Sequence, residues 1–143
     1  MDWPRLCPDL PALEACAREL AAELQPGAVL ALDGDLGAGK TTFTQALLKA
    51  LGSTETVTSP TFSLVHEYEG APWPVAHFDF YRLEASSELD GLGWDDYLER
   101  GGLVIVEWAT LHPDYLPPET RWLSFEILPG GERRIAQRSA ASS

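Results

Sequence analysis

The residues from Gly34 to Thr41 carry the clearest chemical pattern in this chain. They read Gly-Asp-Leu-Gly-Ala-Gly-Lys-Thr and match G-x-x-x-x-G-K-[ST], the phosphate-binding loop of nucleotide-binding proteins. Glycines allow the backbone to curl so that successive N–H groups point at phosphate oxygens. Lys40 can reach the β- and γ-phosphates, and the Thr41 hydroxyl can bind Mg²⁺. The pattern therefore predicts a bound nucleoside triphosphate with Mg²⁺.

Two acidic side chains that could complete such a site stand at the ends of predicted strands. Glu107 follows the apolar residues 103–106, and Asp79 follows residues 75–78. A phosphate-binding loop usually works with a carboxylate at the end of a neighbouring strand, which holds Mg²⁺ or its water shell. A charge placed there without a function would be costly to desolvate. We expect one carboxylate to serve the metal and the other to position water, and the sequence leaves open which.

Trp108, residues 58–61 and the strand histidines have less specific interpretations. The Trp108 ring either packs on a nucleobase or belongs to the core. The hydroxyl-rich residues 58–61 form either a loop that orders around the γ-phosphate or an ordinary polar turn. His66 and His77 are interpreted as polar strand residues, because the chain has no paired His or Cys spacing that would indicate zinc.

The loop motif has the strand–loop–helix setting that it requires. Apolar residues 28–32 precede it and predict a buried strand. Residues 43–51 follow it with helical periodicity, and Gly52 can end that helix. Further upstream, Asp9 can cap a helix that ends at residues 26–27.

The rest of the chain predicts two hairpins, one more buried strand and a helical stretch. The strands are expected at residues 62–68, 75–79, 103–107, 121–128 and 132–138. One helix or two short ones are expected over residues 86–100, and a loop over residues 111–120. These elements predict an α/β fold, a three-layer sandwich like that of P-loop NTPases with a mixed parallel and antiparallel central sheet. We expect one domain over residues 1–138 and a disordered tail over residues 139–143.

Length and composition set limits on the class of protein. A chain of 143 residues is long enough for one domain with a sizeable core. No apolar run approaches the ~20 residues of a membrane span, and the N-terminus lacks the features of a secretory signal. We therefore expect a cytoplasmic protein with no membrane contact. Cys7 and Cys16 are too few for a disulfide framework; we expect Cys16 on a helix face and Cys7 as an incidental thiol.

The formal net charge of −12 argues against independent binding to nucleic acid. Such binding usually needs a basic face, because neutralising phosphates supplies most of the affinity. The chain has only 10 Lys and Arg residues, and they are spread along its length. If the protein serves an RNA pathway, we expect it to do so through a protein partner. The alternative is that surface acidity only aids solubility.

A set of motifs taken together resembles the TsaE family, also called YjeE. The motifs are the phosphate-binding loop with Thr42, Val57-Thr-Ser-Pro-Thr-Phe62, His77-Phe-Asp-Phe-Tyr-Arg-Leu83 and Val106-Glu-Trp108. Their order and spacing match the family from about Leu10 to Ile127. The resemblance implies a small bacterial ATPase, weak when alone, that is needed to make N6-threonylcarbamoyladenosine (t6A) beside the anticodon of tRNA. It also implies that the protein acts with TsaB and TsaD, and that it meets tRNA only through that complex.

The resemblance implies roles for individual residues when they are carried over by position. Lys40, Asp79 and Glu107 would form the catalytic set, with Thr41 and Glu107 as ligands of Mg²⁺. Trp108 would lie near the base of ATP. The full nucleotide-binding set would be Asp35, Leu36, Gly37, Ala38, Gly39, Lys40, Thr41, Thr42 and Trp108. Residues 58–61 would form a switch-like loop.

Three other classes of protein share a phosphate-binding loop. A small-molecule kinase usually has a lid with arginines, and residues 54–74 contain none. A regulatory GTPase typically reads guanine with N-K-x-D, and this chain contains no Asn. Its D-x-x-G match at residues 90–93 does not end an apolar strand. A non-catalytic module that binds partners according to its nucleotide is the third alternative.

Overall fold

The computed structural model describes residues 1–143 apart from residues 35–36, 54–64, 70–71, 86 and 139–143. Within the described residues, a seven-stranded sheet has the order β1-β7-β6-β2-β5-β4-β3. The strands are β1 (Arg5–Cys7), β2 (Val29–Gly34), β3 (Val65–Tyr68), β4 (Val75–Asp79), β5 (Leu103–Glu107), β6 (Arg121–Ile127) and β7 (Arg133–Arg138). The helices are α1 (Leu10–Glu23), α2 (Lys40–Ala50), α3 (Ser87–Leu92) and α4 (Trp94–Glu99), with 3₁₀ turns η1 (Phe80–Arg82), η2 (Ala109–Leu111) and η3 (Pro113–Tyr115).

The middle of the sheet is parallel and its two sides are antiparallel. Strands β6, β2, β5 and β4 run in the same direction, so their carboxyl ends meet at one edge. Strand β3 pairs antiparallel with β4, and β7 pairs antiparallel with both β6 and β1. This arrangement confirms the predicted α/β fold with a mixed central sheet.

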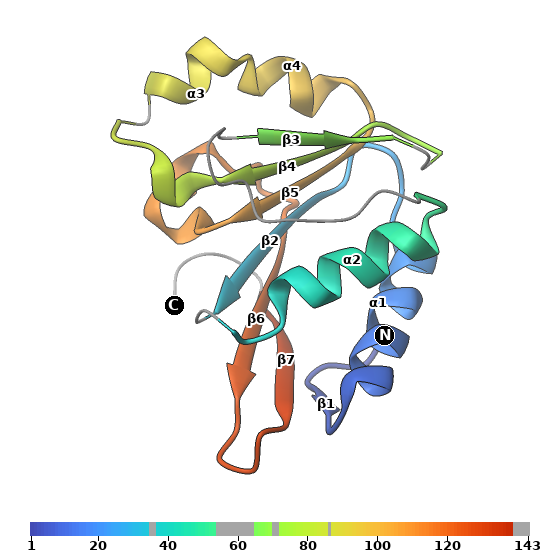
Figure 1. The fold of residues 1–143 in the computed structure, drawn as a ribbon. Coiled ribbons are helices and arrows are strands. Elements are labelled where there is room, and N and C mark those ends of the chain that lie inside the picture. The colour runs from blue at the N-terminus through green and yellow to red at the C-terminus, as the bar shows by residue number, and fades with distance from the viewer. Residues whose placement is uncertain (35–36, 54–64, 70–71, 86, 139–143) are drawn as a thin grey trace.

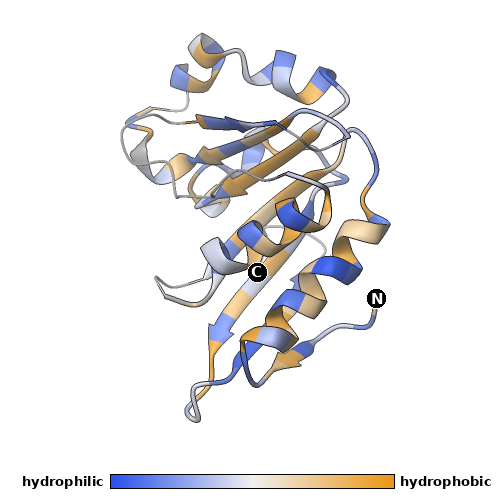
Figure 2. Cartoon of the chain, turned by 45° about the vertical axis from the view of Figure 1, so that its right-hand side comes forward, coloured by the Kyte–Doolittle hydropathy of each residue, from blue (hydrophilic) through white to orange (hydrophobic). Residues whose placement is uncertain are grey.

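The two faces of the sheet carry separate apolar clusters, which make the layers. Helices α1 and α2 lie side by side over one face, where Leu20 and Phe43 join Leu30 and Ile105 from the strands (Figure 1). On the other face, Trp94 of α4 and Leu89 of α3 pack with alternate strand residues. Hydrophobic colour accordingly runs along the central strands, while the helices show both colours (Figure 2). Because successive side chains of a strand point to opposite faces of the sheet, every second residue of each strand faces α1 and α2.

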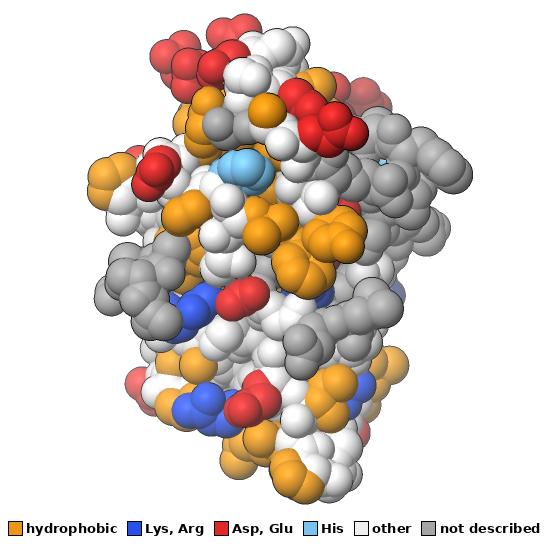
Figure 3. Space-filling view, turned by 90° about the vertical axis from the view of Figure 1, so that its left-hand side faces the viewer, with side chains coloured by type: hydrophobic (Ala, Val, Ile, Leu, Met, Phe, Trp, Pro, Cys, Tyr) orange, Lys and Arg blue, Asp and Glu red, His pale blue; other side chains and the backbone are white. Residues whose placement is uncertain are grey.

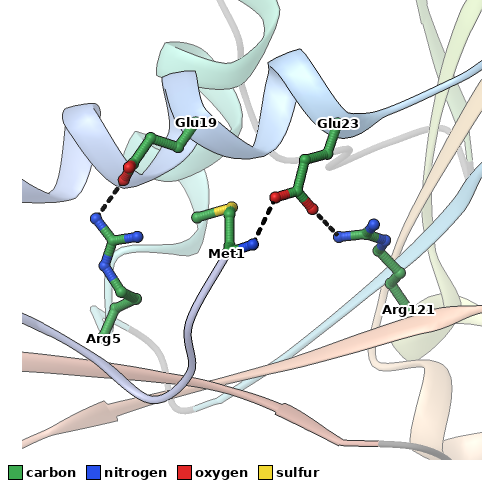
Figure 4. A network of polar contacts seen from close by, with 5 residues as sticks. All are labelled: Met1, Arg5, Glu19, Glu23 and Arg121. Carbon is green, nitrogen blue, oxygen red and sulfur yellow. Dashed lines mark hydrogen bonds and ion pairs between the residues drawn. The ribbon is translucent and has the colours of Figure 1, made fainter.

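An ionic network joins the N-terminal segment to α1 and the sheet. Glu23 of α1 accepts from the amino group of Met1 at 2.7 Å and from the Arg121 guanidinium of β6 at 3.1 Å (Figure 4). One turn earlier on α1, Glu19 pairs with Arg5 of β1. These contacts hold the start of the chain beside α1.

Most predicted elements are present, with small changes in their limits. Asp9 caps α1 as predicted, because its carboxylate accepts from the Ala12 N–H at 3.0 Å. The helical stretch divides into α3 and α4 at Gly93, which has a φ of +81°. Strand β1 was not predicted, since three residues are too few to show a pattern. The predicted loop over residues 111–120 contains η3. The predictions for residues 54–60, 62–64 and 139–143 lie outside the described residues.

Both cysteines are buried, and neither is paired in a disulfide. Cys16 packs on the inner face of α1 as predicted. In the part of the chain that the structure describes, no helix is both long and apolar enough to cross a membrane.

Candidate nucleotide-binding site

The parallel strands bring the predicted acidic residues to one edge of the sheet. Asp79 ends β4 and Glu107 ends β5, and the two are paired in the parallel register. Glu107 is also paired with Leu32 of β2, two residues before the phosphate-binding loop begins. Ligands of open α/β sheets bind at the carboxyl ends of the strands. The sequence motifs that lie far apart along the chain therefore converge at this edge.

Glycines shape the loop between β2 and α2. Gly37 and Gly39 have φ values of +84° and +102°, which residues with a Cβ rarely adopt. Gly39 also caps α2, so the first N–H groups of this eleven-residue helix are directed out of its end. Gly34 meets β6 closely, because a Cβ there would stand 2.5 Å from the carbonyl oxygen of Phe125. The loop is thus bent as an anion site at a helix N-terminus requires.

A pocket of about 440 Å³ opens at the loop and the strand ends. This volume is in the usual range for small-molecule sites. Its walls are Cys7, Pro8, Asp9, Leu10, Leu13, Gly37, Gly39, Lys40, Thr41, Thr42, Asp79, Glu107, Trp108, Gly131 and Arg133. Loop, strand ends, N-terminal segment and the β6–β7 hairpin therefore all contribute to one cavity.

Lys40 is buried and held by three neighbours. Its Nζ donates to the carbonyl oxygen of Gly34 at 2.7 Å and lies 3.8 Å from Oε1 of Glu107. The same ammonium lies 5.1 Å from the centre of the Trp108 ring, a cation–π distance. These contacts hold the Lys40 ammonium at the wall of the pocket.

Glu107 is an ionised carboxylate inside the protein. Burial alone would raise its pKa, but a hydrogen bond from His77 and electrostatic interactions with His77 and Lys40 outweigh burial and bring the pKa below its ordinary value. His77 Nε2 lies 2.7 Å from Glu107 Oε2. Because an ionised carboxylate only accepts hydrogen bonds, Nε2 carries the proton and donates.

Asp79 and Trp108 border the pocket from two turns that follow the strands. Asp79 caps η1, where its carboxylate accepts from the Tyr81 N–H at 3.0 Å. Trp108 has a φ of +59°, so its backbone is left-handed, a strained conformation for a bulky residue. This turn places its ring 5.1 Å from the Tyr81 ring and over Lys40. Such strain is typical of functional sites.

The donor set of the pocket fits Mg²⁺. The Thr41 hydroxyl and the carboxylates of Asp79 and Glu107 are hard oxygen ligands in one cavity. Within the described residues, no group of three or more His, Cys, Asp or Glu side chains could hold a metal by itself. Mg²⁺ in nucleotide sites is bound in this way, through one or two protein ligands together with phosphates and water.

The pocket brings together most of the residues predicted from the sequence. Gly37, Gly39, Lys40, Thr41, Thr42, Asp79, Glu107 and Trp108 all line it. Ala38 is buried against the core and does not. Asp35, Leu36 and the switch-like residues 58–61 lie outside the described residues.

Sequence reasoning missed three contributors to the site. His77, interpreted only as a polar strand residue, donates to Glu107. The N-terminal segment 7–10 forms one wall, so Cys7, expected to be an incidental thiol, lines the pocket. Arg133 of β7 reaches across to donate to the carbonyl oxygen of Gly37 at 3.2 Å. A contact between residues 96 positions apart leaves no local signal in the sequence.

The chain is similar in sequence to known proteins of one family. The family model described as "Threonylcarbamoyl adenosine biosynthesis protein TsaE" matches residues 7–136. The "tRNA threonylcarbamoyladenosine biosynthesis protein TsaE" of Bacillus subtilis is 42% identical over 135 residues, which cover 94% of this chain and 83% of that protein. The protein of the same name from Rickettsia felis is 35% identical, over 89% of this chain and 75% of its own length.

A solved structure agrees with the sequence relatives. The crystal structure of Bacillus subtilis YdiB superimposes with a TM-score of 0.78 and 35% sequence identity, covering 94% of this chain and 83% of that chain. On the family model, the relatives and the shared fold, this chain belongs to the TsaE family.

Proposed function

We propose that this chain is an Mg²⁺-dependent protein that binds and hydrolyses ATP in support of t6A modification of tRNA, acting with TsaB and TsaD. The observation that carries the proposal is the convergence of Lys40, Thr41, Asp79 and Glu107 on one pocket in a member of the TsaE family. The proposed role also places the protein in the cytoplasm, and brings it to tRNA only through the TsaB–TsaD complex.

The residues of the pocket have distinct tasks in the proposed reaction. The N–H groups of the loop and of the α2 N-terminus bind phosphate oxygens, and Lys40 adds a positive charge that is already close by. Thr41 and Glu107 would hold Mg²⁺, which supplies charge neutralisation at the phosphates when it is bound. Asp79, at the end of the adjacent strand, would then orient the attacking water. The Trp108 ring offers a surface to the nucleotide.

A weak ATPase when alone is consistent with this set of residues. The cations that line the pocket are Lys40 and Arg133, within the described residues. Arg133 already donates to carbonyl oxygens of Gly131 and Gly37. Phosphoryl transfer is accelerated by further positive charge or by better-placed water. The proposal therefore expects the TsaB–TsaD complex to stimulate hydrolysis.

Steady-state ATP consumption separates the proposal from its main alternative, a small-molecule kinase. We expect TsaB and TsaD together to raise the rate, and candidate acceptor metabolites to leave it unchanged. Lys40→Ala and Glu107→Ala should each abolish the stimulated rate. A rate that rises with an acceptor and yields a phosphorylated metabolite would establish the kinase. Stimulated hydrolysis that persists in Glu107→Ala would remove that residue from the mechanism.

A further inference from the structure

A histidine that the catalytic scheme does not use lies beneath the pocket. His77 is in the middle of β4 and is fully buried. Its Nε2 lies 2.7 Å from Glu107 Oε2. Its Nδ1 is buried too and has no hydrogen-bond partner among the described residues. Glu107 is therefore the polar partner that the structure gives this imidazole.

The strand register explains how the two side chains meet. His77 is paired with Ile105 of β5, and Glu107 follows two residues later on the same face. That face is the one covered by α1 and α2, where Ile105 and Val75 pack in the core. The Glu107 side chain can thus lie back along the strand toward His77, below the floor of the pocket.

Packing alone gives no reason for a histidine at this position. Its neighbours on this face include Val75, Ile105 and Tyr68, whose ring centre is 6.4 Å from that of His77. An apolar side chain would fill the same space without burying polar nitrogens, and burying them costs free energy unless they are bonded. The hydrogen bond to Glu107 offsets part of that cost and leaves Nδ1 unpaired.

The two oxygens of the Glu107 carboxylate have different partners. Oε2 accepts from His77, while Oε1 faces Lys40 Nζ at 3.8 Å. The terminal torsion of a glutamate is broad, so a carboxylate held at one oxygen only by a distant lysine would rotate. Fixing Oε2 removes this freedom and keeps Oε1 on the side of the pocket.

We propose that His77 is a positioning residue for Glu107. Its imidazole holds Oε2 of the carboxylate, so that Oε1 stays directed into the pocket, where it would bind Mg²⁺. The proposal rests on the function proposed above, because it gives Glu107 a role toward Mg²⁺. Partners of this kind orient metal-binding carboxylates in many proteins, and their loss typically lowers metal affinity about 10- to 100-fold.

Two amide substitutions test the proposal with nearly the same chemistry. In His77→Gln the amide nitrogen reaches the place of Nε2 and can still donate to Glu107, whereas in His77→Asn it reaches only the place of Nδ1. Calorimetry would give the affinity for a non-hydrolysable ATP analogue in Mg²⁺ and again in EDTA. The ratio of the two affinities is the readout. We expect His77→Asn to reduce this ratio about tenfold or more and His77→Gln to retain most of it. The affinity measured in EDTA should change little in either variant.

Two further proteins serve as controls. In a Glu107→Gln background, His77→Asn should not lower the affinity ratio further, since both substitutions remove the same interaction between His77 and the Glu107 carboxylate. The same Asn substitution at His66, which lies opposite His77 on β3, should leave the ratio unchanged. Thermal unfolding of each variant would report general damage. If His77→Asn does not fold, His77→Leu replaces it as the variant without a donor.

The outcomes separate this proposal from the proposed function. The role of His77 would be overturned if the variant without a donor had the same affinity ratio as the wild type. It would also be overturned if His77→Gln lowered the ratio as much as that variant does. A further loss in the Glu107→Gln background would also contradict it. If Mg²⁺ does not strengthen nucleotide binding even in the wild type, the proposed function itself fails.

Discussion

At the scale of single residues, the site is held together by a short chain of charged contacts. Glu107 lies between a histidine below it and a lysine above it, and all three are buried. Each charge here has a neighbour of opposite sign or a hydrogen bond, as buried ionic groups require. Lys40 donates to the Gly34 carbonyl oxygen and lies close to the Trp108 ring. An ammonium has three N–H donors, so a phosphate oxygen can bind Lys40 while the hydrogen bond to Gly34 remains.

The lowered pKa of Glu107 predicts a pH dependence of stability. A carboxylate with a folded-state pKa below the ordinary 4.5 stabilises the protein above that pH, and the contribution is lost as pH falls through the folded pKa. The free energy of unfolding should thus fall more steeply below pH 4.5 in the wild type than in Glu107→Gln. Urea denaturation at a series of pH values would measure both slopes. Identical slopes would mean that Glu107 is not stabilised as an anion.

At the scale of elements, close backbone contacts decide where the strands start. Gly102 precedes β5 and accepts from the Gly27 N–H at 2.7 Å, while the next residue, Leu103, donates to Pro74 at 2.9 Å. A Cβ on Gly102 would stand 2.0 Å from the Pro74 carbonyl oxygen. The starts of β2, β4 and β5 therefore meet at one glycine.

This contact predicts opposite effects for two Gly→Ala substitutions. Gly102→Ala should lower the free energy of unfolding by about 1–3 kcal/mol, because the strands must move apart. Gly91→Ala should raise it by about 0.5–1 kcal/mol, since Gly91 lies in α3 and its Cβ would meet nothing within 4 Å. Chemical denaturation of both variants gives the comparison. If the Gly102→Ala protein were as stable as the Gly91→Ala protein, the close contact between Gly102 and the Pro74 carbonyl would be contradicted.

The elements and the site differ in how well the sequence predicts them. Strand β5 is four apolar residues followed by Glu107, so its existence and its functional end can both be read locally. The phosphate-binding loop is equally local, because its glycines and the start of α2 are adjacent in the chain. Strand β1 has no such pattern, and it forms by pairing with β7 at the other end of the chain.

The roles of His77 and Arg133 could not be predicted for a related reason. Each depends on which residue of a distant element faces it, and this is set by strand register and by the packing of the hairpin. A histidine in a strand shows only that a polar group is present. Its contact with Glu107 follows once β4 and β5 are known to be parallel neighbours.

At the scale of the whole molecule, charge is distributed unevenly. Acidic side chains gather at the end of the molecule formed by α3 and α4, as Figure 3 shows, and Glu88, Asp90, Asp95 and Asp96 belong to these helices. The net charge of the chain is −12. A polyanion such as tRNA is repelled by such a surface.

The charge predicts that the isolated protein does not bind tRNA. In an electrophoretic mobility assay with unmodified tRNA at about 0.1 M salt, we expect no shift from this chain alone. TsaB and TsaD would supply the contacts, so a shift should require them. Binding by the chain alone, weakening with added salt, would contradict this expectation.

Under the proposed function, ATP hydrolysed at the pocket supports repeated rounds of t6A formation by TsaB and TsaD. The most direct measurement is the amount of t6A made per TsaB–TsaD complex over several turnovers, with threonylcarbamoyl-adenylate and tRNA supplied. We predict that wild-type protein with ATP and Mg²⁺ raises this amount well above one per complex, and that Lys40→Ala leaves it near one. If Lys40→Ala sustained as many turnovers as the wild type, ATP turnover at this pocket would not drive the modification.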